Sequence, residues 1–321
     1  TVWDDMSSNN WDAQQPTTVA NQPTYLTNQF NFNPTLDFTS ASGLLEIPDN
    51  NYKYSFNVAY SFATGFPTIT SQSVAGSTTS ISGVQEIAEV INYTSVPTAA
   101  QIKTIESYLA TKYGITLTSD YMGSDGVTKV FDLAANSGYN ENIFGIGRAD
   151  CEGLHQRQSK SINNDALITI GNNNLIDAVN GNSSAAGNDI ATNNSYLYLG
   201  NNSGTIVWNT SQKIDNKYHL NRTWKLQETG TIGSVKISVP AVSNNSGSLT
   251  LPDFSNNLIY QNSTVYLAVD NDGDFTNGGT TYLPMTAVGS GTSLTYEVDV
   301  DLTNGSPYLR FAVDPSTTDT D

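Results

Sequence analysis

Short runs in which apolar and polar residues alternate dominate the sequence after residue 115, and clusters of Asn, Gly and Ser separate them. About nine runs at this spacing are typical of a β-sandwich. In the run near residue 300, Val298, Val300 and Leu302 fall on one face, and the acidic residues between them fall on the other. Because the side chains of a strand alternate between its two faces, this pattern predicts antiparallel strands with one buried and one solvent-facing side.

The part before residue 64 has shorter apolar runs, which Asn, Pro and Thr interrupt. Strands are predicted at Leu36–Phe38 and Leu44–Ile47, and a longer strand is predicted over residues 52–62. One face of the longer run carries only large apolar side chains: Tyr54, Phe56, Val58 and Tyr60. The stretch 64–83 is rich in Gly, Ser and Thr, so it is predicted to be a loop or a joint.

One amphipathic helix is predicted over Ala99–Tyr113. Thr98 and Gln101 form a capping-box pattern at its start, and Gly114 stands where a helix commonly ends. The apolar residues of this segment are spaced three and four apart: Ile102, Ile105, Leu109 and Tyr113. Such a stripe is typical of a core face, so we expect the helix to pack on a sheet formed in part by Ile87–Tyr93.

The length of the chain favours more than one core, because 321 residues exceed what a single hydrophobic core usually reaches. The patterns together predict a mostly β chain in two parts. The first part, residues 1–118, is expected to be a jelly-roll-like antiparallel β-sandwich with the one amphipathic helix. The second part, residues 119–321, is expected to be another β-sandwich.

The charge balance narrows the range of partners. Lys and Arg number 13 against 30 Asp and Glu, which gives a formal charge of −17. A surface this negative repels phosphate backbones and copies of itself, so it excludes nucleic acid and favours a monomer. No apolar run is long enough for a membrane span. A single cysteine, Cys151, cannot form an internal disulfide, which makes bound cations a natural source of extra stability.

The sequence DNDGDFT is the strongest candidate for a metal site. Asp270, Asp272 and Asp274 take positions 1, 3 and 5 of an EF-hand-like calcium loop, Gly273 permits a sharp turn, and Thr276 supplies a carbonyl near position 7. Position 12 is not Glu and no helices flank the loop, so a true EF-hand is excluded. The pattern predicts Ca²⁺ at this loop.

Further ligands would have to come from elsewhere in the chain, and Asp253, Asp299 and Asp301 are the candidates. From residue 237 to the end, Arg310 is the only basic residue against ten acidic residues. Such a cluster repels itself unless cations or water screen it, which favours a bound divalent ion. The alternative is a solvated turn closed by its own Asp side chains.

Enzymatic motifs are absent from the sequence: no His-Glu-x-x-His, Gly-x-Ser-x-Gly or phosphate-binding loop occurs. The chain is therefore predicted not to be an enzyme. Carboxylate pairs for glycoside hydrolysis stay open, because sequence spacing does not reveal their separation in space. Large aromatic side chains are candidate platforms for sugar stacking: Trp11, Tyr139, Trp208 and Trp224. Most of them are expected to be core or strand-face residues instead.

Two passages resemble a known class of proteins. Residues 86–117, EIAEVINYTSVPTAAQIKTIESYLATKYGITL, are similar to the closing strand and helix of laminin-G-like, concanavalin A-like jelly-roll modules of very large bacterial surface proteins. The opening WDDMSSNNWDAQQPTT is similar to the first strand and loop of that module. Residues 142–172, together with RTWKLQETG, resemble the β domain that follows such modules in adhesins and gliding-motility surface proteins.

The resemblance implies an exported segment of a bacterial surface adhesin, without catalytic activity and loaded with calcium. A complete jelly roll of this type needs about twice the length that lies between Trp3 and Glu86. We therefore expect the split arrangement of RTX-type adhesins, in which another domain is inserted, here near residues 65–83.

The favoured hypothesis is a calcium-stabilised module of a bacterial cell-surface adhesin, which acts as a rigid scaffold or presents a ligand in adhesion or biofilm formation. Its expected partners are a glycan or another cell-surface ligand and the neighbouring adhesin domains. Two alternatives stay open. One is a lectin-like glycan-binding module or a carbohydrate-active enzyme, and the other is a spacer that only holds an inserted binding domain away from the cell.

Overall fold

The computed structural model describes residues 2–4, 6, 11–14, 21–38, 44–48, 51–61, 65–74, 79–82, 86–172, 189–241, 264–290, 293–302 and 307–314. Within these ranges the chain consists of antiparallel sheets and one α-helix, which confirms the predicted mostly β class. No helix in these ranges is long and apolar enough to cross a membrane.

The N-terminal unit contains two sheets. The first is five-stranded, in the order β3 (Thr24–Phe30), β4 (Asn33–Asp37), β9 (Glu86–Tyr93), β6 (Tyr54–Ser61) and β7 (Phe66–Ser73). The second is four-stranded, in the order β1 (Val2–Trp3), β2 (Ala13–Gln14), β5 (Leu44–Ile47) and β8 (Thr79–Ser82). A small apolar core that includes Phe38, Leu45 and Val90 lies between them.

Two strand predictions for this unit are confirmed and one is wrong. Strand β5 covers the predicted residues, and in β6 the side chains of Phe56 and Val58 are fully buried on one face, as the alternation indicates. The stretch 64–83 is not merely a loop or a joint, because it contains β7 and β8. Strand β7 pairs with β6 over its whole length, and its Thr and Ile residues suit a strand better than a loop.

The C-terminal sandwich also contains two sheets. The larger is nine-stranded: β13 (Leu154–Gln156), β12 (Glu141–Ala149), β16 (Ser195–Asn201), β19 (Trp224–Thr229), β25 (Tyr308–Val313), β18 (Lys217–Leu220) and β17 (Trp208–Ile214) follow in order, and β21 (Val265–Asp270) pairs with β25 and with β22 (Thr281–Pro284). The smaller has the order β14 (Gln158–Lys160), β15 (Thr169–Asn172), β20 (Ser234–Pro240), β24 (Thr295–Asp301) and β23 (Thr286–Val288).

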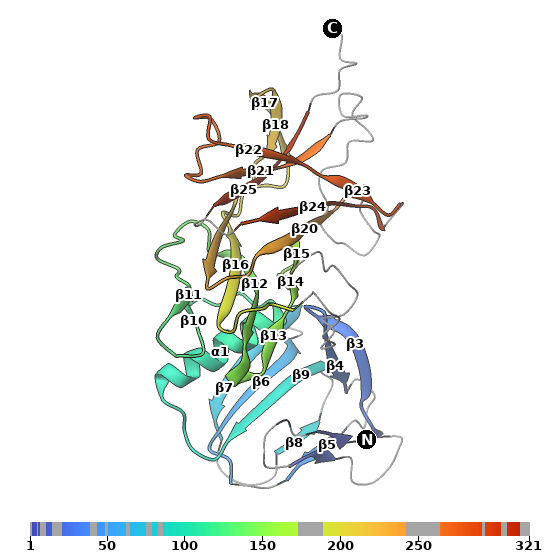
Figure 1. Ribbon diagram of the computed structural model, residues 1–321. Coiled ribbons are helices and arrows are strands. Elements are labelled where there is room, and N and C mark those ends of the chain that lie inside the picture. The colour runs from blue at the N-terminus through green and yellow to red at the C-terminus, as the bar shows by residue number, and fades with distance from the viewer. Residues whose placement is uncertain are drawn as a thin grey trace.

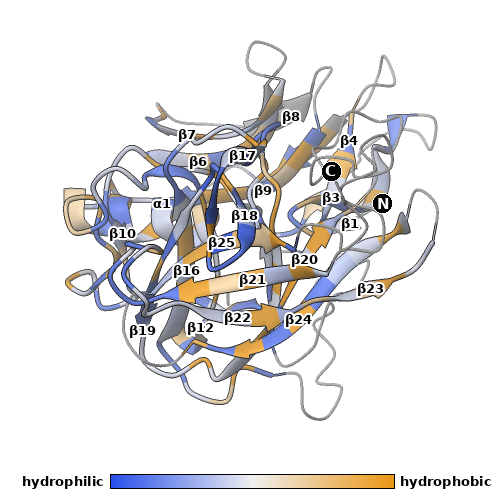
Figure 2. Ribbon diagram, turned by 90° about the horizontal axis from the view of Figure 1, so that it is seen from above, coloured by the Kyte–Doolittle hydropathy of each residue, from blue (hydrophilic) through white to orange (hydrophobic). Residues whose placement is uncertain are grey.

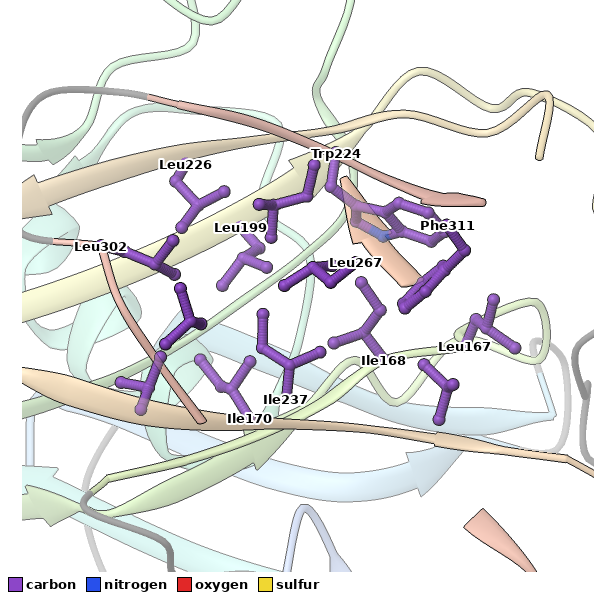
Figure 3. Close-up of a cluster of buried hydrophobic side chains, with 14 of the residues drawn as sticks. Leu167, Ile168, Ile170, Leu199, Trp224, Leu226, Ile237, Leu267, Leu302 and Phe311 are labelled. Carbon is purple, nitrogen blue, oxygen red and sulfur yellow. The ribbon is translucent and has the colours of Figure 1, made fainter. Parts of the chain in front are cut away.

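The core of this sandwich is built by strands that place alternate residues inside, and Val235, Ile237 and Val239 of β20 are buried. In Figure 2 hydrophobic and hydrophilic colours alternate along the ribbon of β24. Trp224, Leu267 and Phe311 come from the larger sheet and meet Ile170 and Ile237 of the smaller sheet (Figure 3). The predicted alternation near residue 300 is confirmed, because Val300 and Leu302 are buried and the acidic residues of β24 lie on the outer side.

The helix α1 (Ala99–Tyr113) lies between the two units (Figure 1). Its capping box and its Gly114 end form as predicted, and Gly114 has the left-handed φ of 66° that favours glycine there. Leu109 and Tyr113 share one core with Phe56 of β6 and with Tyr198 of β16. The helix and the hairpin of β10 (Tyr121–Met122) and β11 (Lys129–Phe131) therefore fill a layer between the N-terminal five-stranded sheet and the nine-stranded sheet.

Candidate functional site

The acidic loop connects β21 to β22, because β21 ends at Asp270 and β22 begins at Thr281. Asp270 is only 2% exposed. Its Oδ1 accepts hydrogen bonds from the backbone amides of Asp272 at 3.0 Å and Gly273 at 2.8 Å, and its Oδ2 accepts one from the hydroxyl of Thr280 at 2.8 Å. The buried carboxylate therefore closes the loop on itself.

The other predicted ligands also bind the loop's own backbone. Asp272 Oδ1 accepts the amide of Asp274 at 2.8 Å, and its Oδ2 accepts the side-chain amide of Asn277 at 2.8 Å. Asp274 Oδ1 accepts both the amide and the hydroxyl of Thr276. The amide of Asp274, followed by that of Asn277, lowers the pKa of Asp272, so this exposed carboxylate is ionised at neutral pH.

The four residues are thus neighbours in one loop, but their carboxylates are arranged as turn acceptors. In the part of the chain that the structure describes, no group of three or more His, Cys, Asp or Glu side chains is arranged to hold a metal ion. Of the expected further ligands, Asp253 lies outside the described residues, and Asp299 and Asp301 lie on β24 in the other sheet. The ligands in this loop are all oxygen atoms, which suits Ca²⁺. In the structure these oxygens accept hydrogen bonds from the loop and do not surround one point. Calcium at this loop therefore stays a prediction.

The positively charged side chain of Arg310 packs against the acidic loop. Phe275 is buried at the loop's centre, and the guanidinium of Arg310 lies 4.2 Å from the centre of its ring. Arg310 also donates from two nitrogens to the hydroxyl of Thr223, at 3.0 and 2.8 Å. Burial lowers the pKa of Arg310, and Tyr139, Tyr282 and Asp270 oppose this effect. The one basic residue after position 236 thus lies against the ring of the acidic loop.

The aromatic candidates for sugar stacking are mostly engaged in packing. Trp224 and Trp208 belong to the core of the C-terminal sandwich, with 1% and 9% exposure, which confirms the expectation that most of these rings are core residues. Trp11 packs edge-on against Tyr52 of the N-terminal core. Tyr139 is half-buried and packs against Tyr308 on the outer face of β25, with ring centres 5.3 Å apart.

The layer around α1 contains a second cluster of polar groups. Glu89 of β9 accepts hydrogen bonds from three side chains of the helix: Tyr108 at 2.9 Å, Lys112 at 2.8 Å and Tyr113 at 2.8 Å. Burial raises the pKa of the hydroxyls of Tyr108 and Tyr113, and the charge of Glu89 raises it further, so both hydroxyls stay protonated donors. Glu89 therefore fastens the helix to the N-terminal sheet.

A buried amide network connects the C-terminal end of the helix to both units. Asn31, in the turn between β3 and β4, is fully buried and donates to the carbonyl of Lys112 at 3.1 Å and to the hydroxyl of Ser159 at 3.0 Å. Its Oδ1 accepts the backbone amide of Lys160 at 2.7 Å. Asn33 donates to the same Lys112 carbonyl at 2.7 Å. One asparagine thus binds the helix end and strand β14 of the C-terminal sandwich at once.

Two glycines in the sequence FGIGR make room for this layer. On β12, Gly145 and Gly147 lie opposite Tyr198 and Tyr196 of β16, and a Cβ on either glycine would come within 2.6 or 2.5 Å of the facing ring. The rings therefore lie across β12, and the hydroxyl of Tyr198 reaches Thr111 of the helix. Sequence reasoning does not find this contact, although glycines inside a strand pattern indicate a close approach.

The fold defines a class of protein in which one helix packs between two antiparallel β units. The chain matches the family described as Domain of unknown function (DUF8202) over residues 101–306, and it belongs to that family. The matched region begins within α1 and ends just before β25, so it includes most of the helix that the sequence analysis assigns to the first part. Neither the curated proteins nor the solved structures contain a match to the chain.

Proposed function

We propose that this chain is a rigid, non-catalytic segment of a bacterial cell-surface adhesin, in which two β units act as one mechanical body. The observation that carries the proposal is the junction around Asn31. There the N-terminal hairpin, the helix end and β14 share buried hydrogen bonds. The junction also contains a hydrophobic core to which the helix and both units contribute side chains.

The junction supports this proposal because it lies between the N-terminal unit and the C-terminal sandwich. Strand β1 belongs to the outer sheet of one unit, and β25 belongs to the sandwich of the other (Figure 1). Tension applied across the chain therefore passes through α1 and its contacts. A buried, hydrogen-bonded interface of this kind resists bending, whereas two domains joined by a polar linker would move independently.

The same proposal has three finer parts. The segment binds calcium at Asp270, Asp272, Asp274 and Thr276. It lies outside the cell, and it contacts neighbouring adhesin domains. The spacing of the acidic residues and the excess of ten acids over one base near the C-terminus support the calcium part. The sequence resemblance supports the cell-surface part.

Scanning calorimetry of the full chain tests the proposal. One cooperative unfolding transition is expected, because neither unit can unfold without exposing the core shared with α1. Asn31→Ala should lower the stability by about 1–3 kcal/mol, since it removes the donor and leaves buried partners unsatisfied. Asn221→Ala, at an exposed asparagine, is the matched control. Two well-separated transitions in the unaltered chain would contradict a single rigid body.

A further inference from the structure

The turn between β3 and β4 has an unfavourable backbone conformation at Phe32. Phe30 pairs with Asn33, so Asn31 and Phe32 form a two-residue turn, and their φ angles are 48° and 67°. Turns with two positive φ angles usually have Asn, Asp or Gly in these positions, because a larger side chain crowds the backbone there. Among the residues that the structure describes, every other non-glycine residue with a positive φ is Asn, Asp or Ser. Phe32 is therefore strained.

The strand pairing of this hairpin does little to hold the turn. The ladder between β3 and β4 is irregular between Leu26 and Phe30, and Asn28 within that stretch also has a positive φ of 55°. Beyond this irregularity, the ladder continues only with the pair of Phe30 and Asn33. The end of the hairpin can therefore adopt other conformations unless further contacts fix it.

The C-terminal sandwich supplies such contacts. Gln156 of β13 donates its side-chain amide to the backbone carbonyl of Asn31 at 3.1 Å, beside Asn33 of the hairpin itself at 2.9 Å, and this fixes the peptide unit directly before Phe32. The backbone amide of Lys160 donates to Asn31 Oδ1 at 2.7 Å. The side chains of Asn31 and Gln156 are buried, so these bonds are shielded from water. The closed junction thus holds the turn in its strained conformation.

The ring of Phe32 offsets only part of the strain. The ammonium group of Lys160 lies 5.5 Å from the ring centre, and such a contact at an exposed site changes an equilibrium constant by about two- to fivefold. A left-handed conformation disfavours a bulky residue by about five- to thirtyfold. Within the described residues Phe32 belongs to no hydrophobic core cluster. The hydrogen bonds of Asn31 therefore supply the difference.

We propose that the Asn31–Phe32 turn makes the junction releasable: the closed junction holds the turn in a strained conformation, and the turn relaxes when the two units separate. The inference rests on the junction that carries the proposed function, and it adds the point at which that junction yields. At rest the buried hydrogen bonds of Asn31 keep the segment closed. Under tension the relaxing turn favours opening, so the two units separate before either of them unfolds.

Amide hydrogen exchange of the full chain tests the proposal, with Phe32→Ala and Phe32→Gly as paired variants. Both remove the ring and its contact with Lys160, but only glycine adopts the left-handed conformation readily. The amide of Lys160 is the reporter, because its bond to Asn31 breaks when the junction opens. This amide should be protected about threefold more in Phe32→Gly than in Phe32→Ala. Equal protection in the two variants, or less in Phe32→Gly, would overturn the proposal.

A second hairpin of the chain gives the matched control. The turn between β17 and β18 has the same two positive φ angles, 49° at Asp215 and 62° at Asn216. It lies at the end of the C-terminal sandwich that is far from the N-terminal unit (Figure 1). Asn216→Ala and Asn216→Gly should therefore give the same protection of the Lys160 amide. A difference as large as that between the two Phe32 variants would overturn the proposal, because it would show that Lys160 exchanges only when the whole chain unfolds.

The amide of Leu226 reports global unfolding, since it donates to the carbonyl of Pro307 at 3.0 Å and Leu226 is fully buried in the C-terminal core. In the unaltered chain it should be protected at least about tenfold more than the amide of Lys160, because the junction opens at a lower free energy than the core. Equal protection of the two amides would show that the junction does not open by itself, which would overturn the proposal.

Pulling the full chain from its two ends tests the consequence under load. A short extension should precede the unfolding of either unit, at a higher force in Phe32→Gly than in Phe32→Ala. Unfolding of a whole unit as the first step would overturn the proposal. Two well-separated calorimetric transitions in the unaltered chain would contradict the rigid segment, whereas one transition with equal protection in the two Phe32 variants would overturn only the role of the turn.

Discussion

Gly145 on β12 lies directly opposite Tyr198 on β16, so close that a Cβ on the glycine would come within 2.6 Å of the tyrosine ring. The ring can reach across the strand and place its hydroxyl beside Thr111 of α1 only because this position has no side chain. The glycine is therefore required for space, since its φ is not in the left-handed region. The position of the helix on the nine-stranded sheet depends on this contact.

Gly145→Ala should destabilise the chain by about 1–3 kcal/mol, because the added methyl group forces the ring or the backbone to move in a close-packed layer. Urea unfolding measures the effect. Gly279→Ala is the control, since its nearest neighbouring atom is 3.7 Å away and its φ is ordinary. Equal effects at the two positions would contradict the packing argument.

His219 should make the chain sensitive to acid. It is buried, its Nε2 lies 3.1 Å from the hydroxyl of Tyr282, and that hydroxyl donates to Asp215, which leaves Nε2 as the protonated nitrogen. Burial, followed by the charge of Arg310, lowers the pKa of His219 to about 4. Because the unfolded state takes up the proton near 6.5, stability is full above 6.5 and falls as the pH decreases toward 4.

Proton NMR checks this prediction cleanly, since the chain has only two histidines. The signals of His219 should stay in the neutral form down to pH 5. His219→Gln should reduce the loss of melting temperature between pH 6.5 and 4.5, whereas His155→Gln should keep most of it, because His155 is more exposed. A midpoint of 6 or above for His219 would contradict the prediction.

Excess calcium should raise the melting temperature relative to EDTA, if the proposed ion binds the loop between β21 and β22. Asp272→Ala should remove the rise, because Asp272 is an exposed carboxylate at position 3 of the pattern. Asp125→Ala is a matched control: Asp125 also accepts two backbone amides in an exposed turn, without further acids in the pattern. Identical melts in calcium and EDTA would leave the loop as a turn closed by its own side chains.

Glu89→Gln should weaken the attachment of the helix to the N-terminal sheet. The change replaces a half-buried carboxylate that accepts from Tyr108, Lys112 and Tyr113, and it removes the 2.8 Å ion pair with Lys112. A loss of about 1–3 kcal/mol is expected for hydrogen bonds to a charged acceptor. Calorimetry measures it, with Glu46→Gln on the exposed face of β5 as the control. A loss no larger than that of Glu46→Gln would contradict the role of Glu89.

The local elements were predictable where the pattern is strong. The capping box and Gly114 define both ends of α1, and alternation identifies the buried face of β24, since both signals arise from neighbouring residues. The Gly-, Ser- and Thr-rich stretch that forms β7 was not predictable in this way. Its strand conformation depends on pairing with β6 rather than on its own composition.

In the candidate site, too, the sequence predicted the local pattern, and only the structure showed the contacts between distant residues. The spacing of Asp270, Asp272 and Asp274 identifies an acidic loop, but only the structure shows that each carboxylate accepts hydrogen bonds from the loop itself and that Arg310 lies beneath it. The sequence also drew attention to Trp208 and Trp224 as surface candidates, and the fold buries both. Burial depends on which faces of the sheets meet, and residue type alone does not decide it.

The sequence by itself determined the mostly β class, the helix with its caps, the alternation of the last strands and the strong negative charge, because each of these depends on composition or on residues close together in the chain. Only the tertiary structure decided that α1 lies between two β units, that Asn31 meets Ser159, and that the hydroxyl of Tyr198 meets that of Thr111. These relationships join residues far apart in the chain. They follow from how whole sheets pack, which no local pattern encodes.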